Sequence, residues 1–148
     1  MTDSSILPVV DKPATIKNVA NFLTKTLPKM ARICGYGMAG IKDLNVNDLP
    51  TELPNRDENI TIVRYKTAQM IVKQTLIAIE AVRNIPIKDK HNETCYIILK
   101  KRYVEECSDG EACEATGYSK STYFHTWKLR ALLQFADCYL LTDLHVFK

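Results

Sequence analysis

The sequence predicts an all-α fold, and three observations support this prediction. The chain of 148 residues is 46 % hydrophobic and 25 % charged, which is the balance of an ordinary globular protein. Apolar residues recur at spacings of three and four along several stretches, whereas a long alternation of apolar and polar residues does not occur. The chain holds only 5 glycines, so helices can run without interruption between them.

The first region, residues 1–60, is predicted to be an N-terminal arm and a helical region of less regular structure. Two prolines indicate a flexible arm over residues 1–13. Residues 14–33 then carry apolar side chains at helical spacing, and Pro28 predicts a kink or an end within this helix. Closely spaced glycines and prolines after the helix predict loops. The sequence assigns no role to this region.

The second region, residues 61–91, is predicted to be a long connecting helix followed by a linker. Residues 61–84 contain neither glycine nor proline, and Pro86 ends the helix. Apolar residues cover more than one side of it. We therefore expect this helix to pack on two sides, within the chain or against a second copy.

The third region, residues 92–148, is predicted to be a helix-turn-helix domain. Asn92 is a candidate N-cap for a helix that extends to residue 104. Ser108 and Glu111 then match the capping box S-x-x-E, in which each side chain accepts a hydrogen bond from the backbone of the other residue. The helix that this box opens is short, because Gly117 stands at its C-cap position.

The residues around Gly117 meet the steric demands of a helix-turn-helix. Gly117 suits a turn that needs a positive φ, and Ser119 is a candidate N-cap for the next helix, residues 120–140. Small residues for a close helix crossing are Ala112, Cys113 and Ala115, and aromatic residues that anchor the second helix in the core are Tyr123, Trp127 and Phe135. The second helix is therefore predicted to be the one that enters the major groove of DNA.

The residues predicted to contact DNA lie mainly near the start of this second helix. Five acids and no base occupy residues 105–114, whereas three bases and no acid occupy residues 117–136. We assign base edges and phosphates to Lys120, Ser121, Thr122 and His125, and phosphates also to Lys128 and, from the preceding helix, Lys101. Glu111 is partly explained by the capping box, and the other acids are expected to face solvent or a basic surface of RNA polymerase.

The sequence argues against several other classes of protein. Its 5 cysteines are irregularly spaced and form no C-x-x-C pair, which is typical of a reducing compartment. It shows no signal peptide and no apolar run of about 18 residues, so we expect a cytoplasmic protein that does not cross a membrane. The spacing of Cys107, Cys113 and His125 fits no zinc site, and no phosphate-binding or catalytic motif stands out. We therefore expect no metal, no cofactor and no enzymatic activity.

Three stretches of the last region carry a resemblance to a known family. They are Ile98-Leu99-Lys100-Lys101-Arg102-Tyr103, Gly117-Tyr118-Ser119-Lys120-Ser121-Thr122-Tyr123-Phe124 and Ala131-Leu132-Leu133-Gln134-Phe135-Ala136. Together they resemble the ArpU family of phage transcriptional regulators. The resemblance implies a C-terminal unit similar to the promoter-reading domain of bacterial sigma factors. It also implies a phage or prophage activator of late genes for packaging, morphogenesis and lysis, in the cytoplasm of a Gram-positive host.

The predicted partner is double-stranded DNA at a promoter or operator. Because the second helix carries few cations, one copy is expected to bind weakly at physiological salt. A homodimer or a contact with host RNA polymerase is expected to supply the remaining affinity for DNA. Two other classes fit the same residues: a small terminase subunit or other DNA-packaging protein, and a protein-interaction module that does not bind DNA.

Overall fold

The structure, a computed structural model, describes residues 8–49, 59–86 and 90–148. It confirms the predicted all-α fold: within these residues every regular element is helical, apart from one isolated β-bridge between Val10 and Phe147. In chain order the elements are α1 (Lys12–Asn21), η2 (Phe22–Thr26), α2 (Leu27–Ile33), α3 (Gly37–Ile41), η3 (Val46–Asp48), α4 (Ile60–Arg83), α5 (Lys90–Leu99), η4 (Lys100–Val104), α6 (Asp109–Thr116), α7 (Lys120–Thr122), η5 (Tyr123–Trp127) and α8 (Lys128–Cys138).

The first long helix starts earlier than predicted and does not end at its proline. The carboxylate of Asp11 accepts a hydrogen bond from the N–H of Ala14 at 3.1 Å, so Pro13 lies in the first helical turn instead of in an arm. A proline fits there because the first N–H groups of a helix have no partner within it. Pro28 is accommodated by the π-helical turn η2 just before it, in which Leu27 donates to the carbonyl of Phe22, five residues earlier.

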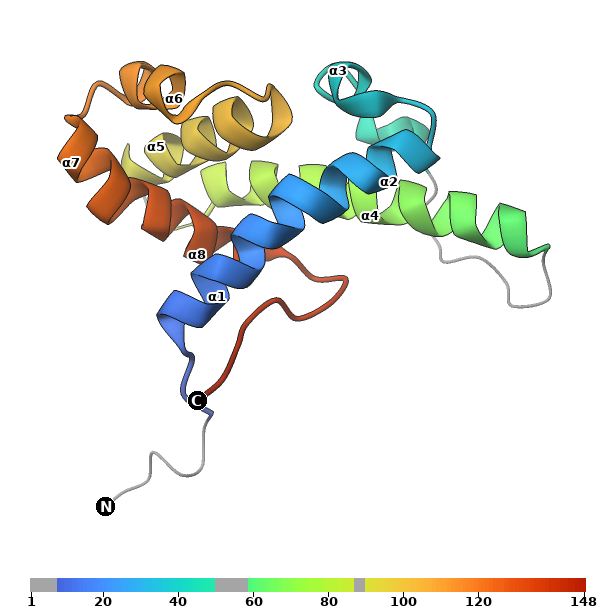
Figure 1. Cartoon of the computed structure of the whole chain (residues 1–148), viewed down its shortest axis with the longest axis horizontal. Helices are drawn as coiled ribbons and strands as arrows, with labels where there is room; N and C mark the ends of the chain where they lie inside the picture. Colours follow the sequence, from blue (N-terminus) through green and yellow to red (C-terminus); the bar gives the residue numbers. More distant parts are fainter. Residues whose placement is uncertain (1–7, 50–58, 87–89) are drawn as a thin grey trace.

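The helices pack into one body with a shared core. In Figure 1, α1 crosses α8, and α2 packs obliquely across α4. Helix α5 packs against α4, α6 and α8. The buried side chains form one cluster that includes residues of the N-terminal helices, such as Leu23, and of the C-terminal helices, such as Ile98 and Phe135. The division into three regions stays a prediction, but the core is continuous across the described parts of all three.

Helix α4 agrees with the predicted long helix to within a residue at each end. All of its buried residues lie at or after Ala68, where the helix contacts α2, α5 and α8. Its N-terminal part extends past α2 in Figure 1 and exposes Ile60, Ile62 and Tyr65. The second half of α4 therefore has the predicted packing on more than one side within the chain.

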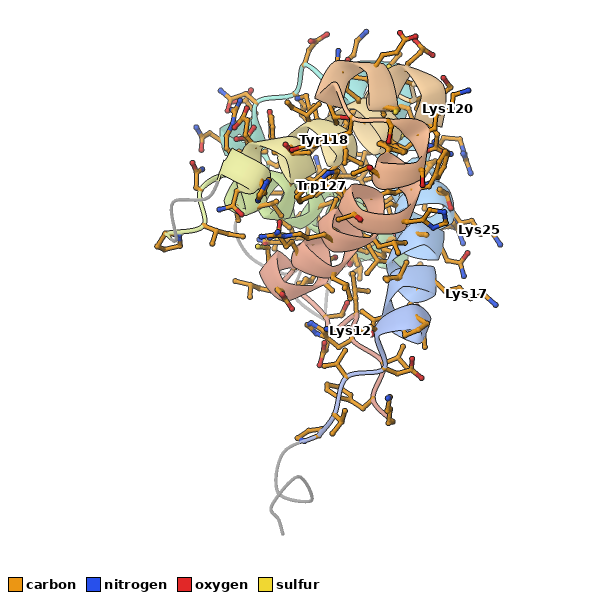
Figure 2. All side chains as sticks on the ribbon, turned by 90° about the vertical axis from the view of Figure 1, so that its left-hand side faces the viewer. Lys12, Lys17, Lys25, Tyr118, Lys120 and Trp127 are labelled. Carbon is orange, nitrogen blue, oxygen red and sulfur yellow. The ribbon has the colours of Figure 1, made fainter. Side chains whose placement is uncertain are left out.

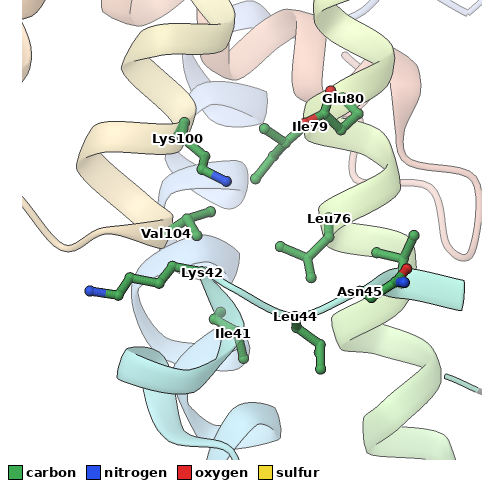
Figure 3. Close-up of a pocket in the computed structure, with 10 residues that line it drawn as sticks. Ile41, Lys42, Leu44, Asn45, Leu76, Ile79, Glu80, Lys100 and Val104 are labelled. Atoms are coloured by element: carbon green, nitrogen blue, oxygen red, sulfur yellow. The ribbon is translucent and has the colours of Figure 1, made fainter. Parts of the chain in front are cut away.

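A pocket shows how the N-terminal segments rest on the later helices. It has a volume of about 220 Å³ and is bounded by the end of α3 and the loop after it, by α4 and by η4 (Figure 3). Ile41, Leu76 and Val104 contribute apolar side chains from these three places. Glu80 also borders the pocket, and its carboxylate already accepts a hydrogen bond from the hydroxyl of Tyr96 at 3.1 Å.

The C-terminal segment after α8 returns to α1 and fastens it to the rest of the protein. The side-chain amide of Asn18 donates to the carbonyl of Leu144 at 2.9 Å, and the N–H of Val146 donates to the hydroxyl of Thr15 at 2.9 Å. His145 lies between two carboxylates, at 2.7 Å from Asp137 and 2.6 Å from Asp143. These polar contacts fix α1 relative to α8.

The contacts of His145 should contribute a stabilisation that depends on pH. The hydrogen bond with Asp137, and further contacts with Asp143, raise the pKa of His145 above its ordinary value of 6.5. A raised pKa means that the folded state binds the proton more tightly, so the stabilisation is complete below pH 6.5 and lost as pH rises through the folded pKa. We expect the stability difference between the wild type and His145→Gln to shrink as the pH is raised from about 6 to 9, measured by thermal unfolding. A difference that stays constant over this range would contradict the charged contact.

Candidate nucleic-acid interface

The turn between α6 and α7 is built by the local signals that the sequence predicted. The hydroxyl of Ser108 accepts from the N–H of Glu111 at 3.1 Å, and the Glu111 carboxylate accepts from the N–H of Ser108 at 3.2 Å, which confirms the capping box. Gly117 ends α6 with φ at +78°, the left-handed region in which a side chain would be strained. The thiol of Cys113 contacts the carbonyl of Tyr118 at 3.2 Å across the turn.

Ser119 caps the helix that follows the turn, as predicted. Its hydroxyl oxygen accepts from the N–H of Thr122 at 3.3 Å and lies 3.0 Å from the Thr122 hydroxyl oxygen. The Thr122 side chain is therefore engaged within its own helix and is half-buried. Of the residues assigned to base edges and phosphates, Thr122 is the one whose hydroxyl bonds to the N-cap residue Ser119.

One side of the helix formed by α7, η5 and α8 is anchored in the core. Tyr123, Trp127 and Phe135 are all buried, which confirms their predicted place. Ala112 and Cys113 of α6 are buried as well, but Ala115 is exposed, so its prediction as a residue of the helix crossing is wrong. Two small residues in the middle of α6, not three, line that helix's buried side.

The other side of this helix is open to solvent near its start. Lys120, Ser121 and His125 are exposed, in agreement with a role in contacts outside the protein. Phe124 is also exposed, at 42 %, and was not among the predicted contacts. An exposed phenylalanine on such a helix can contact the methyl group of thymine. The sequence alone did not tell Phe124 from its buried neighbour Tyr123, because both are aromatic.

Lys128, which was assigned to phosphate, is held by a carboxylate of the protein itself. Its ammonium lies 3.0 Å from Asp109, and its side chain is only 20 % exposed. The hydroxyl of Tyr123 donates to the same carboxylate at 2.8 Å, and Nε of Arg102 lies 3.5 Å away. We call these four residues the Asp109 cluster; it joins the start of α6 to η4 and to the helix after the turn.

The charge of Asp109 is favoured in this cluster. Burial raises the pKa of Asp109, whereas the hydrogen bonds from Lys128 and Tyr123 lower it, as do the charges of Lys128 and Arg102. The lowering effects are larger in sum, so the pKa lies below its ordinary value. Burial, followed by the hydrogen bond to Asp109, raises the pKa of Tyr123, so its hydroxyl stays protonated as a donor.

The remaining predicted contact, Lys101, lies on η4 and not on the helix after the turn. Its ammonium pairs with Glu105, one turn later, at 3.2 Å. Within the acidic run 105–114, Glu105, Asp109 and Glu111 thus each have a partner in the chain, and Glu106 and Glu114 are exposed. The capping by Glu111 was predicted, whereas the ion pairs of Glu105 and Asp109 were not part of the expected solvated face.

A basic surface on the N-terminal helices was missed by the sequence reasoning. Residues 12–42 contain six lysines and arginines and no acid. In Figure 2, Lys17 and Lys25 project toward the same side of the molecule as Lys120, whereas Lys12 projects elsewhere. The signal was present in the charge distribution, since this acid-free stretch is longer than the acid-free residues 117–136.

Among the residues that the structure describes, neither a metal-binding group nor a membrane-spanning helix is found. No three His, Cys, Asp or Glu side chains in residues 8–49, 59–86 and 90–148 lie close enough to hold a metal ion. No helix in these ranges has the length and apolar character needed to cross a membrane.

Comparison of the chain with protein-family models, with curated proteins and with solved structures found no match.

Proposed function

We propose that this protein is a DNA-binding transcriptional regulator that reads the major groove with the helix formed by α7 and η5, here called the reading helix. One observation carries the proposal. The exposed side of the reading helix bears Lys120, Ser121 and His125 and no acid, while Tyr123 and Trp127 fix its other side in the core. A helix held in this way can enter a groove without losing its place in the fold.

The exposed groups suit the chemistry of a base-pair edge. Ser121 and His125 can each donate and accept hydrogen bonds, which base edges in the major groove require. Lys120 lies in the first turn of the helix, where an ammonium and unpaired N–H groups together favour a phosphate. Phe124 adds an apolar surface for a thymine methyl group.

The resemblance of the last region to ArpU regulators supports a phage or prophage protein that activates late genes in a bacterial cytoplasm. In this role, surfaces outside the reading helix recruit or position the host RNA polymerase. If the protein acts as a homodimer, two reading helices should meet half-sites one helical turn apart, at about 34 Å. The N-terminal half of α4, with exposed Ile60, Ile62 and Tyr65, is available for such contacts.

We expect substitutions on the exposed side of the reading helix to weaken DNA binding without unfolding the protein. Ser121→Ala and His125→Ala should each lower the affinity for a selected duplex by about 1–3 kcal/mol and relax its sequence preference. Lys120→Ala should weaken binding to all duplexes alike. The slope of log affinity against log salt should fall by about 1, as expected for the loss of one phosphate contact. Selection from a random-sequence duplex pool, followed by titration over a salt series, measures both effects.

Lys42→Ala is the matched control, because Lys42 is exposed at the end of α3 beside the pocket of Figure 3, away from the reading helix. Three outcomes count against the proposal. Absence of duplex binding at low salt would favour a protein-interaction module. A ring of about eight or more copies in solution would favour a DNA-packaging protein. Equal effects of Lys42→Ala and Ser121→Ala would remove the assigned role of the reading helix.

A further inference from the structure

The N-terminal helices carry a row of exposed cations that nothing in the described structure neutralises. Lys17, Lys25, Lys29 and Arg32 are all exposed. Among residues 8–49, 59–86 and 90–148 none of the four has a carboxylate within ion-pair distance. We call these four residues the lysine row. Four unpaired cations with no acid nearby in sequence form a surface that attracts a polyanion.

The π turn reduces the angle between two members of the lysine row. Lys17 and Lys25 are eight residues apart, which in a regular α-helix would leave them roughly 80° out of line. Lys25 itself lies within the π turn η2, whose wider turn rotates the chain less per residue and so reduces this angle. Figure 2 shows both side chains projecting from the same side of the helix.

The row is held at a fixed position relative to the reading helix. Helix α1 packs against α8, which continues the reading helix without a break. The ring of Phe22 contacts Phe135 and Tyr139 of that helix end, with centroids 6.1 Å and 5.0 Å apart. The hydrogen bonds of the C-terminal segment fasten the start of α1 as well. The two surfaces therefore move as one body.

A pocket lies where the N-terminal helices meet η4. It has a volume of about 190 Å³ and is lined by Thr24 and Pro28, which neighbour Lys25 and Lys29 in sequence, by Arg102 of η4 and by the exposed acid Glu106. Arg102 in turn belongs to the Asp109 cluster, which contacts the reading helix through Tyr123 and the start of α8 through Lys128. Figure 2 places Lys17 and Lys25 of the row and Lys120 of the reading helix on the same side of the molecule.

We propose that the lysine row is a second DNA contact, which binds backbone phosphates of the same duplex whose major groove receives the reading helix. This inference rests on the proposed function. Lysines on a rigid helix bind phosphates without regard to base sequence, so the row adds affinity and orientation but no specificity. It supplies the cations that the reading helix lacks, since Lys128 is engaged with Asp109.

The test uses the full chain and a duplex of about 30 base pairs. The double variant Lys17→Gln and Lys25→Gln should bind about tenfold more weakly at about 0.1 M salt, and the slope of log affinity against log salt should fall by about 2. Lys12→Gln is the matched control: this exposed lysine lies on the same helix but points elsewhere in Figure 2, so it should bind like the wild type. The conservative pair Lys17→Arg and Lys25→Arg should retain the affinity, and thermal unfolding verifies that all variants are folded.

The outcomes separate this inference from the proposed function. If Lys120→Ala weakens duplex binding and the double variant does not, the phosphate contact of the lysine row is rejected and the proposed role of the reading helix is retained. If the wild type binds no duplex at all, both the proposed function and the phosphate contact of the row are rejected. If the double variant loses binding to vesicles of anionic lipid while its duplex binding is unchanged, the partner is a membrane surface and the inference is overturned.

Discussion

Phe135→Ala is expected to lower the free energy of unfolding by about 3–5 kcal/mol, the usual cost of removing a fully buried phenylalanine ring. The side chain of Phe135 has no exposed surface. Its ring packs against Phe22 of the first long helix and Tyr139 beyond α8, with centroids 6.1 Å and 5.5 Å apart. The cavity would therefore lie where the N-terminal and C-terminal parts of the core meet.

Because the core is shared, this substitution should weaken the whole protein and not only its C-terminal part. Urea unfolding followed by the fluorescence of the single tryptophan, Trp127, reports on the C-terminal helices, and far-UV circular dichroism reports on all helices. The two transitions should coincide in the wild type and shift together in Phe135→Ala. Leu140→Ala is the control, since Leu140 is 84 % exposed and should have little effect. Separate transitions would show that the N-terminal helices fold on their own, as the predicted division at residue 60 would allow.

The features that could be predicted from the sequence are those set by residues close together in the chain. Ser108 and Glu111, three residues apart, specify the capping box, and Gly117 and Ser119 specify the turn after it. A helix cap needs only a side chain and a backbone N–H within one turn, so its sequence signal is local. The same holds for the long α4, where the absence of glycine and proline predicted both ends to within a residue.

The features that could not be predicted depend on which helices meet. The apolar spacing of residues 14–33 predicts a buried face, but not that this face packs on α8 and α4. The pairing of Lys128 with Asp109 joins residues 19 positions apart, and it exists only because α6 folds back on the reading helix. For this reason the sequence assigned Lys128 to DNA, whereas the fold gives its ammonium a partner in the chain.

The lysine row illustrates the same limit at the level of helix geometry. A regular helix would not align Lys17 with Lys25, and a π turn leaves no clear pattern in the apolar spacing. Pro28 was the available signal, since it disfavours a regular helical turn before it. From Pro28 the sequence predicted a kink or an end of the helix, but it did not predict the change in the relative directions of the Lys17 and Lys25 side chains.

Asp109→Asn is expected to destabilise the protein and, under the proposed function, to strengthen its sequence-independent binding to DNA. The amide keeps the shape of the side chain but removes the charge that holds Lys128 at 3.0 Å and Arg102 at 3.5 Å. Because Asp109 and Lys128 are mostly buried, we expect a loss of about 2 kcal/mol, less than for a fully buried pair. The released Lys128 becomes available to a phosphate, and a carboxylate that repels DNA is removed.

The pH dependence of this loss identifies its cause. The pKa of Asp109 is lowered in the folded state, so its contribution is present above its ordinary value of 3.8 and is lost as the pH falls through the folded pKa. The stability of the wild type should therefore approach that of Asp109→Asn in acid and exceed it at neutral pH, as measured by urea unfolding. Glu114→Gln removes an exposed acid from the same helix and should change neither stability nor its pH dependence. A stability that falls while duplex binding also falls would mean that the cluster holds the reading helix in place, and that Lys128 gains no phosphate when Asp109 loses its charge.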